Sequence, residues 1–384
     1  MEVKRDAIKT TVFDSFDEAE SVWRHLEREG ECYAFQTFGW LKNWYNLIGC
    51  HRSIRPFIVS VEQAAGDPLM LLPLGIEKRG LVSCLVWLGG TLTDYKGPLV
   101  SKDISDKFDN DLFLEVWGEI LEELPRFDAI LLEDQPEFIN KQRNPFTHLS
   151  CEPHASSAHF TQISGTLDSF LKEKRSSKSR STERRKFRRL AEHGTLEFVV
   201  ATDEEQIHST LDTMFEQKSE SYKEMGVTDL FAQSIYRDFF RGMSEHYIED
   251  GFVHLCALKQ NERLLATHWG TVYKNRFYFF MPTYARGELA RYAPGNLLMQ
   301  HMFDWCLSNG VQIFDFTVGD EPYKKLWCDE KLNLFNSFDG TTFLGSFYIW
   351  LLKTQWRVKR RIKQSPGLFK AASRLRKLVS DLKR

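Results

Sequence analysis

The segment 319–325, GDEPYKK, gathers the side chains best suited to chemistry in this sequence. Its glycine and proline favour a tight turn that would present Asp320, Glu321, Tyr323 and Lys324 together. Tyr323 can give a proton to a departing thiolate, and Lys324 can pair with a phosphate or carboxylate of an acceptor. A solvated loop is the alternative, although Trp327, of a usually buried type, follows closely. We predict that Tyr323 is catalytic and that Asp320 and Lys324 bind substrate.

Two further residues carry side chains suited to proton transfer. His268 lies in the strand-like ATHWG, and an imidazole with a pKa near neutrality can act as general base for an attacking amine. Asp315 lies in the strand-like FDFT, where its carboxylate would emerge at a sheet edge and orient the acceptor or accept a proton. The alternatives are a buried core histidine and a turn cap. We predict that both residues are catalytic.

The segment 293–296, APGN, opens a helical pattern, with Pro294 in the first turn that proline favours. A helix N-terminus presents unpaired N–H groups and the positive end of the helix dipole, which attract phosphate without a charged side chain. Gly295 permits close approach of a ligand to the backbone. This segment is therefore a candidate site for a phosphorylated group.

Positive charge is concentrated in two segments, although the formal net charge of the 384 residues is only −2. The range 172–189 holds ten basic and two acidic residues, and the range 353–384 holds twelve and one. The first range, with Arg184 and Arg185, would attract an anionic acceptor, a nucleotide-sugar or an acyl carrier protein; a solvated helix face is the alternative. The second contains apolar residues at helical spacing, which are Leu368, Ala371, Leu375, Leu378 and Leu382. A basic amphipathic helix can lie on an anionic membrane or pack on the protein surface.

The length suits two domains, and 42% hydrophobic residues indicate a folded chain. Strand-like runs alternate with helical patterns in both halves, which favours an α/β or α+β fold. A connection rich in Ser, Pro and His lies at about residues 145–160. We expect an N-terminal domain at 1–150, a second domain at 151–345 and a basic helical tail at 346–384.

Two segments of the first half are weakly echoed in the second. GDPLMLLPLGI is similar to NERLLATHWGTV, and each is followed by a further strand-like run, CLVWLGGTL and RFYFFMPTY. The pattern indicates an internal duplication, although any β-hairpin looks similar.

Several function classes are not favoured. The N-terminus lacks the order of a secretory signal, and no apolar run reaches the roughly 20 residues that span a bilayer, so we expect a cytoplasmic protein. Seven cysteines are scattered singly, which predicts reduced thiols and no metal site. Aromatic residues are not interleaved with the cations, which argues against a nucleic-acid partner.

Five separated motifs together resemble a known family. They are FQTFGWLKNWYNLIG, ERRKFRRLAEHGTLEF, LLATHWGTVYKNRFYFFMPTY, RYAPGNLLMQHMFDWCLSNG and FDFTVGDEPYKKLWCDE. In this order they resemble the CelD-like acyltransferases of bacterial cellulose and exopolysaccharide loci, a branch of the GNAT superfamily related to Fem-type aminoacyltransferases. The resemblance covers about residues 30–335, and its most specific element is DF followed by GDEPYK and a tryptophan.

The resemblance implies tandem GNAT-like domains with central mixed, twisted sheets flanked by helices, of which the second keeps the donor site. It implies an acyltransferase that moves an acyl group from acyl-CoA to an amine or hydroxyl of a glycan precursor or other small molecule. Acetyl is the acyl group that the resemblance favours. The thioester would lie in a splay between strands 264–273 and 275–284, and the donor pyrophosphate would lie at Arg291, Pro294, Gly295 and Asn296. Because this loop has a single glycine where the superfamily has two, a carrier-protein thioester or an aminoacyl-tRNA stays open as donor. A non-catalytic scaffold or a protein that binds an anionic polymer is the competing class.

Overall fold

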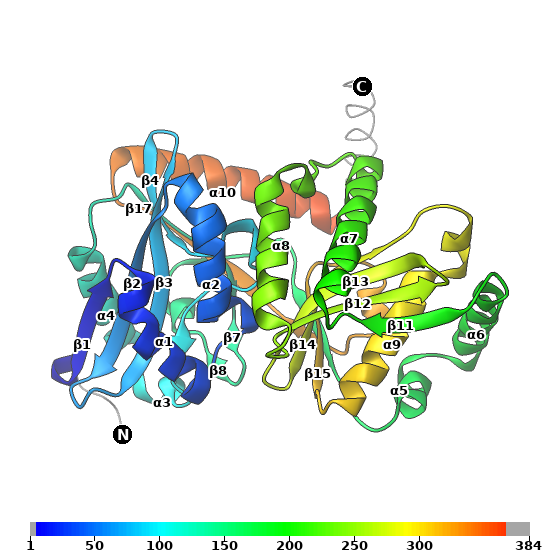
Figure 1. The fold of residues 1–384 in the computed structure, drawn as a ribbon. Coiled ribbons are helices and arrows are strands. Elements are labelled where there is room, and N and C mark those ends of the chain that lie inside the picture. The colour runs from blue at the N-terminus through cyan, green and yellow to red at the C-terminus, as the bar shows by residue number, and fades with distance from the viewer. Residues whose placement is uncertain (1–4, 366–384) are drawn as a thin grey trace. The chain divides into compact units, whose positions relative to one another are not determined.

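The computed structural model describes residues 5–365, which form two compact units (Figure 1). Unit 1 contains the described residues up to 157 together with 332–365, and unit 2 contains 158–331. The expected domain ranges are thereby corrected. The first boundary lies at 157/158 rather than 150/151, and residues from 332 onward return to unit 1 because their strand completes its sheet.

Unit 1 is built on a mixed sheet with the strand order β1-β2-β3-β4-β6-β17-β9, and β5 pairs with β3. Its strands are β1 (Ile8–Phe13), β2 (Arg55–Gln63), β3 (Pro68–Arg79), β4 (Val82–Trp87), β5 (Leu99–Val100), β6 (Ala129–Pro136), β9 (Cys151–Pro153) and β17 (Leu334–Gly340), with β7 (Phe138–Ile139) and β8 (Gln142–Arg143) as a separate pair. Its helices are α1 (Phe16–Glu29), α2 (Phe38–Trp44), α3 (Ile104–Lys107), α4 (Asn110–Glu123) and α10 (Phe343–Gln364). The core lies between this sheet and apolar faces such as Phe113, Val116 and Trp117 of α4.

Unit 2 is built on a sheet with the order β11-β12-β13-β14-β15-β10-β16. Its strands are β10 (Ala158–Gln162), β11 (Leu196–Val200), β12 (Val253–Gln260), β13 (Arg263–Tyr273), β14 (Arg276–Tyr284), β15 (Ile313–Val318) and β16 (Glu330–Leu332). Its helices are α5 (Leu167–Lys174), α6 (Ser177–Ala191), α7 (Glu204–Met225), α8 (Ser234–Tyr247) and α9 (Pro294–Ser308). Met302 and Phe303 of α9 pack on Phe277 and Phe314 of the sheet, so α9 covers one face of it.

The two sheets share one topology. In each, the first four strands are antiparallel, the fourth is parallel to the fifth, and the sixth is antiparallel to the fifth. The echoed segments of the sequence fall on matching strands, β3 with β13 and β4 with β14. The predicted internal duplication is therefore confirmed at the level of topology.

The sixth strand of each sheet comes from an unexpected part of the chain. β17 follows unit 2 in sequence but pairs with β6 of unit 1, and β10 precedes all other strands of unit 2 but pairs with β15. Non-local pairing of this kind leaves no local sequence signal, which explains why the expected domain ranges were misplaced.

Helix α10 begins where the Thr342 side chain accepts a hydrogen bond from the Gly345 amide. Its inner face, Tyr348, Ile349, Leu352 and Trp356, packs on strands β4, β6 and β17 of unit 1 (orange to red in Figure 1). The first part of the expected basic tail is thus a packed helix of unit 1, and the predicted apolar positions from Leu368 to Leu382 lie outside the described residues. No helix within residues 5–365 combines the length and apolar character needed to cross a bilayer.

Candidate active site

The two parallel strands at the centre of unit 2 separate along their length. β14 and β15 pair only at Arg276 with Ile313, Phe277 with Phe314 and Tyr278 with Asp315. Beyond this point β14 continues to Tyr284 along β13, while β15 continues along β10. Within the described chain the facing edges of the two strands therefore open into a V-shaped splay.

A β-bulge lies where β14 leaves β15. Trp269 pairs with Met281 and Thr271 pairs with Tyr278, so two residues of β14, Phe279 and Phe280, lie opposite the single residue Gly270 of β13. A Cβ at Gly270 would lie 2.2 Å from the Tyr278 carbonyl oxygen, so only glycine fits. Bulges bend the bulged strand and increase its local twist, which explains why β14 diverges at this position.

The expected pair of splayed strands is therefore corrected. We predicted the splay between 264–273 and 275–284, but these segments form β13 and β14, an antiparallel hairpin paired from Ala266–Tyr284 to Tyr273–Arg276 apart from the bulge. The parallel neighbour of β14 is β15, which arrives only after the crossover through α9.

A pocket of about 210 Å³ lies at the open end of the splay. Phe279 and Pro282 of β14 and Met299 of α9 give it apolar walls, while Ser221 of α7 and Tyr323 supply hydroxyl groups. The first turn of α9 borders it through Gly295 and Asn296. The structure thus brings together three of the predicted site residues, Gly295, Asn296 and Tyr323.

Helix α9 begins without a side-chain cap. Ala293 precedes it in the left-handed region, at φ 58°, and Pro294 occupies the first helical position with its ring buried. A Cβ on Gly295 would meet only the Tyr284 side chain, at an ordinary 3.6 Å, so the space above this backbone is open. The first turn of α9 can therefore approach a ligand, as a phosphate site requires.

Tyr323 borders the pocket with 36% of its surface exposed and packs edge-on against Phe316. Its hydroxyl has no hydrogen-bond partner within the described residues. Partial burial, reinforced by the negative charge of Glu321, raises the pKa of Tyr323 above its ordinary value. The phenol therefore keeps its proton at neutral pH.

Lys218 of α7 is a functional candidate that sequence reasoning missed. Burial lowers the pKa of its ammonium group from 10.5 to about 8, against the opposing effect of Glu321. Glu321 also acts on Tyr323, so one carboxylate influences both groups. Lys218 lies on α7 three residues before Ser221, which lines the pocket. The signal was available, since Leu211, Met214 and Phe215 define a buried face of α7 and position 218 continues it at helical spacing.

The structure does not support the expected role of His268. It is fully buried and stacks on Phe279 with ring centroids 4.7 Å apart. Burial, followed by the effects of His254 and Lys218, holds the pKa of its imidazole well below the ordinary value. Because no face of the ring is accessible, His268 cannot reach an acceptor, and the core alternative holds.

Asp315 is likewise placed in the interior instead of at the sheet edge. One carboxylate oxygen accepts a hydrogen bond of 2.8 Å from the Arg276 guanidinium, and the other accepts one of 2.7 Å from the Thr317 amide. The side chain is fully buried. The expected catalytic carboxylate is therefore a structural one.

The turn at 319–325 presents its side chains differently from the expectation. Lys324 is 3% exposed and donates hydrogen bonds to the carbonyl oxygens of Thr317 and Val318, with Glu321 3.0 Å away. Its ammonium binds the carbonyl oxygens at the end of β15 and is not directed toward a site for the acceptor substrate. Asp320 is exposed and lies 3.1 Å from His159.

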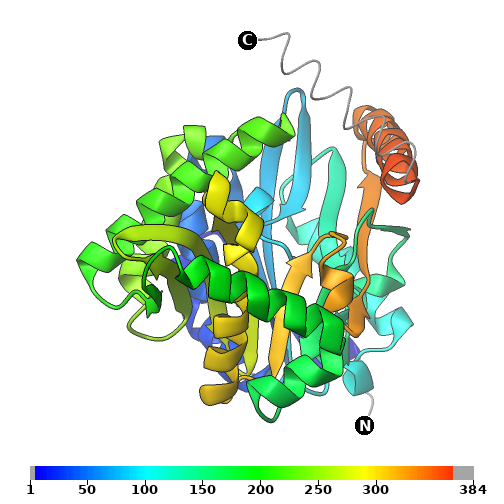
Figure 2. The same cartoon turned by 90° about the vertical axis from the view of Figure 1, so that its right-hand side faces the viewer.

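The predicted cations lie outside the pocket lining. Arg291 is exposed in the 3-10 helix η8 (Glu288–Tyr292), with its guanidinium over the Tyr292 ring. Arg184 and Arg185 are exposed on α6, which crosses α9 (Figure 2). Glu183 fixes this crossing, because its carboxylate accepts hydrogen bonds from Arg175 and from Gln300 of α9.

A larger groove, of about 760 Å³, runs between α7 and strands β11 to β13. Five glutamates line it, namely Glu197, Glu205, Glu216, Glu220 and Glu262. They outnumber the three cations of the groove, Lys259, Arg263 and Arg286, so its net negative charge would repel the phosphates of an anionic donor. We therefore regard the smaller pocket at the splay as the candidate active site.

Comparisons with known proteins agree with this fold. Residues 177–325 match a family model described as "Acetyltransferase (GNAT) domain". The solved structure of FemX is similar at TM-score 0.56 and 12% identity, over 85% of this chain and 96% of that one. A protein of unknown function from Bacteroides thetaiotaomicron matches at TM-score 0.52 and 10% identity, over 85% and 99%. A tandem GNAT protein from the clavulanic acid biosynthesis pathway matches at TM-score 0.49 and 11% identity, over 87% and 99%. No functionally curated protein matches this sequence.

At these identities the structural similarity shows the fold alone, and the match of the family model lies within unit 2. The expected fold class is confirmed: the protein has a mixed α/β architecture with two sheets flanked by helices, similar in fold to FemX. The match to a GNAT acetyltransferase domain supports an acyltransferase.

Proposed function

We propose that unit 2 transfers an acyl group from a thioester donor to an amine or hydroxyl acceptor, with acetyl-CoA as the first donor to test. The parting of β14 and β15 after Tyr278 and Asp315 carries this proposal, because it opens the sheet beside the first turn of α9. Strand edges without partners offer backbone N–H groups that can stabilise the oxyanion formed when a thioester is attacked.

In this proposal the donor phosphates bind at the start of α9. The amides and dipole of the first turn attract them at Gly295 and Asn296. Arg291 and the exposed Arg184 and Arg185 supply longer-range positive charge. Because 210 Å³ is below the roughly 300 Å³ of pockets that enclose drug-sized ligands, the pocket would enclose only the acyl group and the thioester.

We assign the proton transfers to Lys218 and Tyr323. The acceptor amine or hydroxyl attacks the carbonyl carbon, and the neutral amine of Lys218 takes its proton as the new bond forms. When the tetrahedral intermediate collapses, the C–S bond breaks and the Tyr323 phenol gives its proton to the leaving thiolate. Bonds and protons balance without a covalent acyl-enzyme.

Motif resemblance and surface charge narrow the choice of acceptor and of donor. The motif resemblance to CelD-like acyltransferases suggests an acceptor from polysaccharide or cell-envelope biosynthesis. The cations of α6 would favour an anionic acceptor, such as a nucleotide-sugar, or a donor carried on an acyl carrier protein.

A thermal-shift screen with acetyl-CoA, longer acyl-CoA thioesters and free CoA tests donor binding, because a ligand that binds only the folded form raises its apparent stability. Gly295→Asp is the matched variant. An acidic residue in the first turn favours the helix but repels phosphate, and Cβ space is available at this position. We expect Gly295→Asp to fold normally and to weaken donor binding at least tenfold, with Gly295→Ala closer to wild type. Equal shifts for both variants, or no shift with any thioester, would overturn the proposed donor site.

The competing proposal is a non-catalytic scaffold that binds an anionic polymer through α6. Five of its cations are exposed, namely Lys178, Arg184, Arg185, Arg188 and Arg189. Nucleic-acid binding through such a face would fall steeply with salt. Filter binding of single-stranded and duplex nucleic acid at two salt concentrations separates this function from acyl transfer.

We also propose that α10 contacts an anionic membrane surface on its cytoplasmic side. Its outer face exposes Phe343, Phe347, Trp350 and Leu351, and the sequence of the helix has six basic and no acidic residues. Aromatic side chains beside basic residues are typical of helices that lie in the membrane interface.

A further inference from the structure

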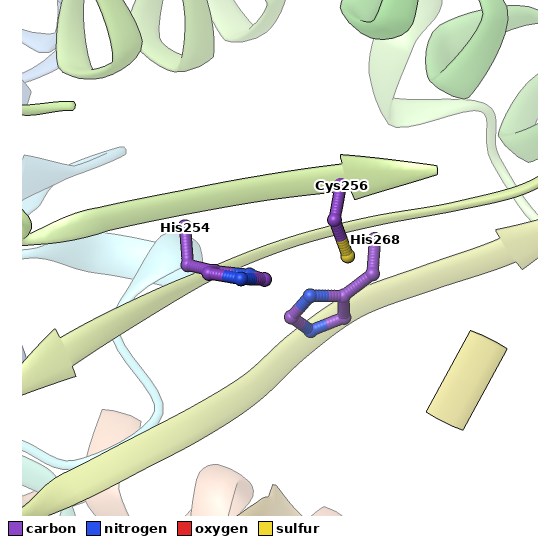
Figure 3. Close-up of side chains that lie close together, drawn as sticks. All are labelled: His254, Cys256 and His268. Carbon is purple, nitrogen blue, oxygen red and sulfur yellow. The ribbon is translucent and has the colours of Figure 1, made fainter. Parts of the chain in front are cut away.

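Three potential metal ligands meet on the face of the unit 2 sheet that α9 covers. His254 and Cys256 lie two residues apart on β12, so they point to the same face, and Cys256 is the register partner of His268 on β13. One ligand atom from each residue lies within 4.8 Å of the other two. Figure 3 shows the Cys256 sulfur and the His254 ring directed toward the His268 imidazole.

The two histidines are buried without partners. None of their four ring nitrogens has a hydrogen-bond partner within the described residues, although His254 is 3% exposed and His268 is fully buried. The aromatic rings of Phe277, Phe279 and Trp305 pack against the two imidazoles and offer no acceptor. Buried polar groups almost always have a partner, so a pair of unsatisfied imidazoles indicates a ligand.

The burial of the two imidazoles suits a metal ion. Both rings lie in an apolar interior, and a neutral imidazole can offer a ring-nitrogen lone pair to an ion. Cys256 is a buried free thiol that carries its proton in the absence of metal. A bound cation would displace that proton, as it does in thiolate sites generally.

A fourth candidate ligand lies on the helix above the sheet. Cys306 of α9 is buried in the same apolar cluster as Cys256. Trp305, the residue before Cys306 in α9, has its ring centroid 4.2 Å from that of His254. Two imidazoles and two thiolates form one of the common donor sets of structural zinc sites.

We propose that His254, Cys256 and His268 bind one Zn²⁺ or Cu⁺ ion, with Cys306 of α9 as the candidate fourth ligand. Tetrahedral Zn²⁺ with nitrogen and sulfur ligands at about 2.0–2.3 Å needs ligand atoms about 3.3–3.8 Å apart. Small side-chain rotations would bring the ligand atoms of His254, Cys256 and His268 from within 4.8 Å to these separations. Both thiols release their protons to solvent on binding, and no redox step is involved. The site is enclosed by the core, so the ion would be structural.

The full-length protein provides the first test. We expect about one equivalent of zinc or copper in protein purified without added chelator, measured by elemental analysis. After removal of the metal, Co²⁺ should bind with one-to-one stoichiometry and give thiolate charge-transfer bands and the visible bands of a tetrahedral complex. Zn²⁺ should displace it and raise the melting temperature. A Cu⁺ competition with a colorimetric chelator distinguishes the two metals.

Two variants that each remove one buried cysteine separate loss of metal binding from loss of packing. Cys84 of β4 is a buried thiol of unit 1, so Cys84→Ala carries a comparable packing cost. We expect Cys256→Ala to lose the Co²⁺ spectrum and Cys84→Ala to retain it. Purified protein without transition metal that also gives no Co²⁺ spectrum would overturn the proposal, as would equal metal binding by the two variants. An unchanged Co²⁺ spectrum in Cys306→Ala would remove Cys306 from the ligand set.

Discussion

Arg276 and Asp315 form a buried ion pair across β14 and β15, with a nitrogen to oxygen distance of 2.8 Å, beside the last register position at which these strands pair. The guanidinium also lies over the Phe160 ring of β10. One ion pair therefore connects three neighbouring strands immediately before the splay opens. It fixes where the strands part, and with it the position of the candidate active site.

Asp315→Ala should destabilise the protein, because it leaves Arg276 buried without its partner and the Thr317 amide without its acceptor. We expect the free energy of unfolding to fall by about 3–5 kcal/mol, measured by urea denaturation. Asp320→Ala, which removes an exposed carboxylate, should cost less than about 1 kcal/mol. A stable but inactive Asp315→Ala variant would instead restore the catalytic role predicted from the sequence.

Lys218 should make acyl transfer depend on pH. With a pKa of about 8, about one-tenth of the amine is neutral at pH 7, so the rate should rise with pH and level off above about pH 8. The groups that act on this amine are Glu321 and His268, and the Tyr323 phenol stays protonated over this range. Lys218→Met should abolish the rise and lower kcat. A wild-type rate that is flat between pH 6.5 and 8.5 would contradict the assignment.

The same substitution should reveal a cost in stability. Because the folded-state pKa of Lys218 lies below its unfolded value of 10.5, burial of the charged form opposes folding fully below about pH 8, and this penalty fades as the pH rises toward 10.5. We expect Lys218→Met to be more stable than wild type at pH 7, by up to about 3 kcal/mol, and the difference to shrink at pH 10. Denaturation at the two pH values measures this trend.

Tyr323 and Lys324 should respond differently to substitution, although they are adjacent in sequence. Tyr323→Phe removes an unpaired hydroxyl and should leave stability unchanged while lowering kcat by about 100-fold. Lys324→Met leaves the carbonyl oxygens of Thr317 and Val318 without their donor and should cost about 1–3 kcal/mol in stability. Equal losses of stability in both variants would contradict the distinction.

The sequence predicted most elements of the fold because they are local. Ser15 caps α1 and Asp203 caps α7, so residues next to each helix in sequence set where it begins. The patterns around β13, β14 and α9 were also located to within a few residues. Hydrophobic periodicity and capping residues act within a few turns of chain, so they can be recognised without tertiary structure.

The site was harder to predict because it depends on long-range pairing. A crossover connection brings β15 beside β14, and the local sequence does not show this pairing. The splay was therefore predicted one strand away, between β13 and β14 instead of between β14 and β15. Asp315 and Lys324 have side chains typical of a catalytic site, but both are used in structural hydrogen bonds. Asp315 accepts one from Arg276, and Lys324 donates one to the Thr317 carbonyl oxygen. Lys218 was overlooked because lysine is usually exposed, although its position continues the buried face of α7 at helical spacing.

The outer face of α10 should mediate binding to anionic membranes. Trp350 is 61% exposed and Phe347 54% exposed, and burying such side chains in the interface gains roughly 1.5–3 kcal/mol each. We expect the Phe347→Ser/Trp350→Ser double variant to lose most sedimentation with phosphatidylglycerol vesicles while keeping its fold, since neither side chain belongs to the inner face of α10. Leu114→Ser on α4, which also removes an exposed apolar side chain, is the control and should bind as wild type does. Equal recovery of all three proteins, or equal binding to purely zwitterionic vesicles, would show that α10 does not recognise an anionic bilayer.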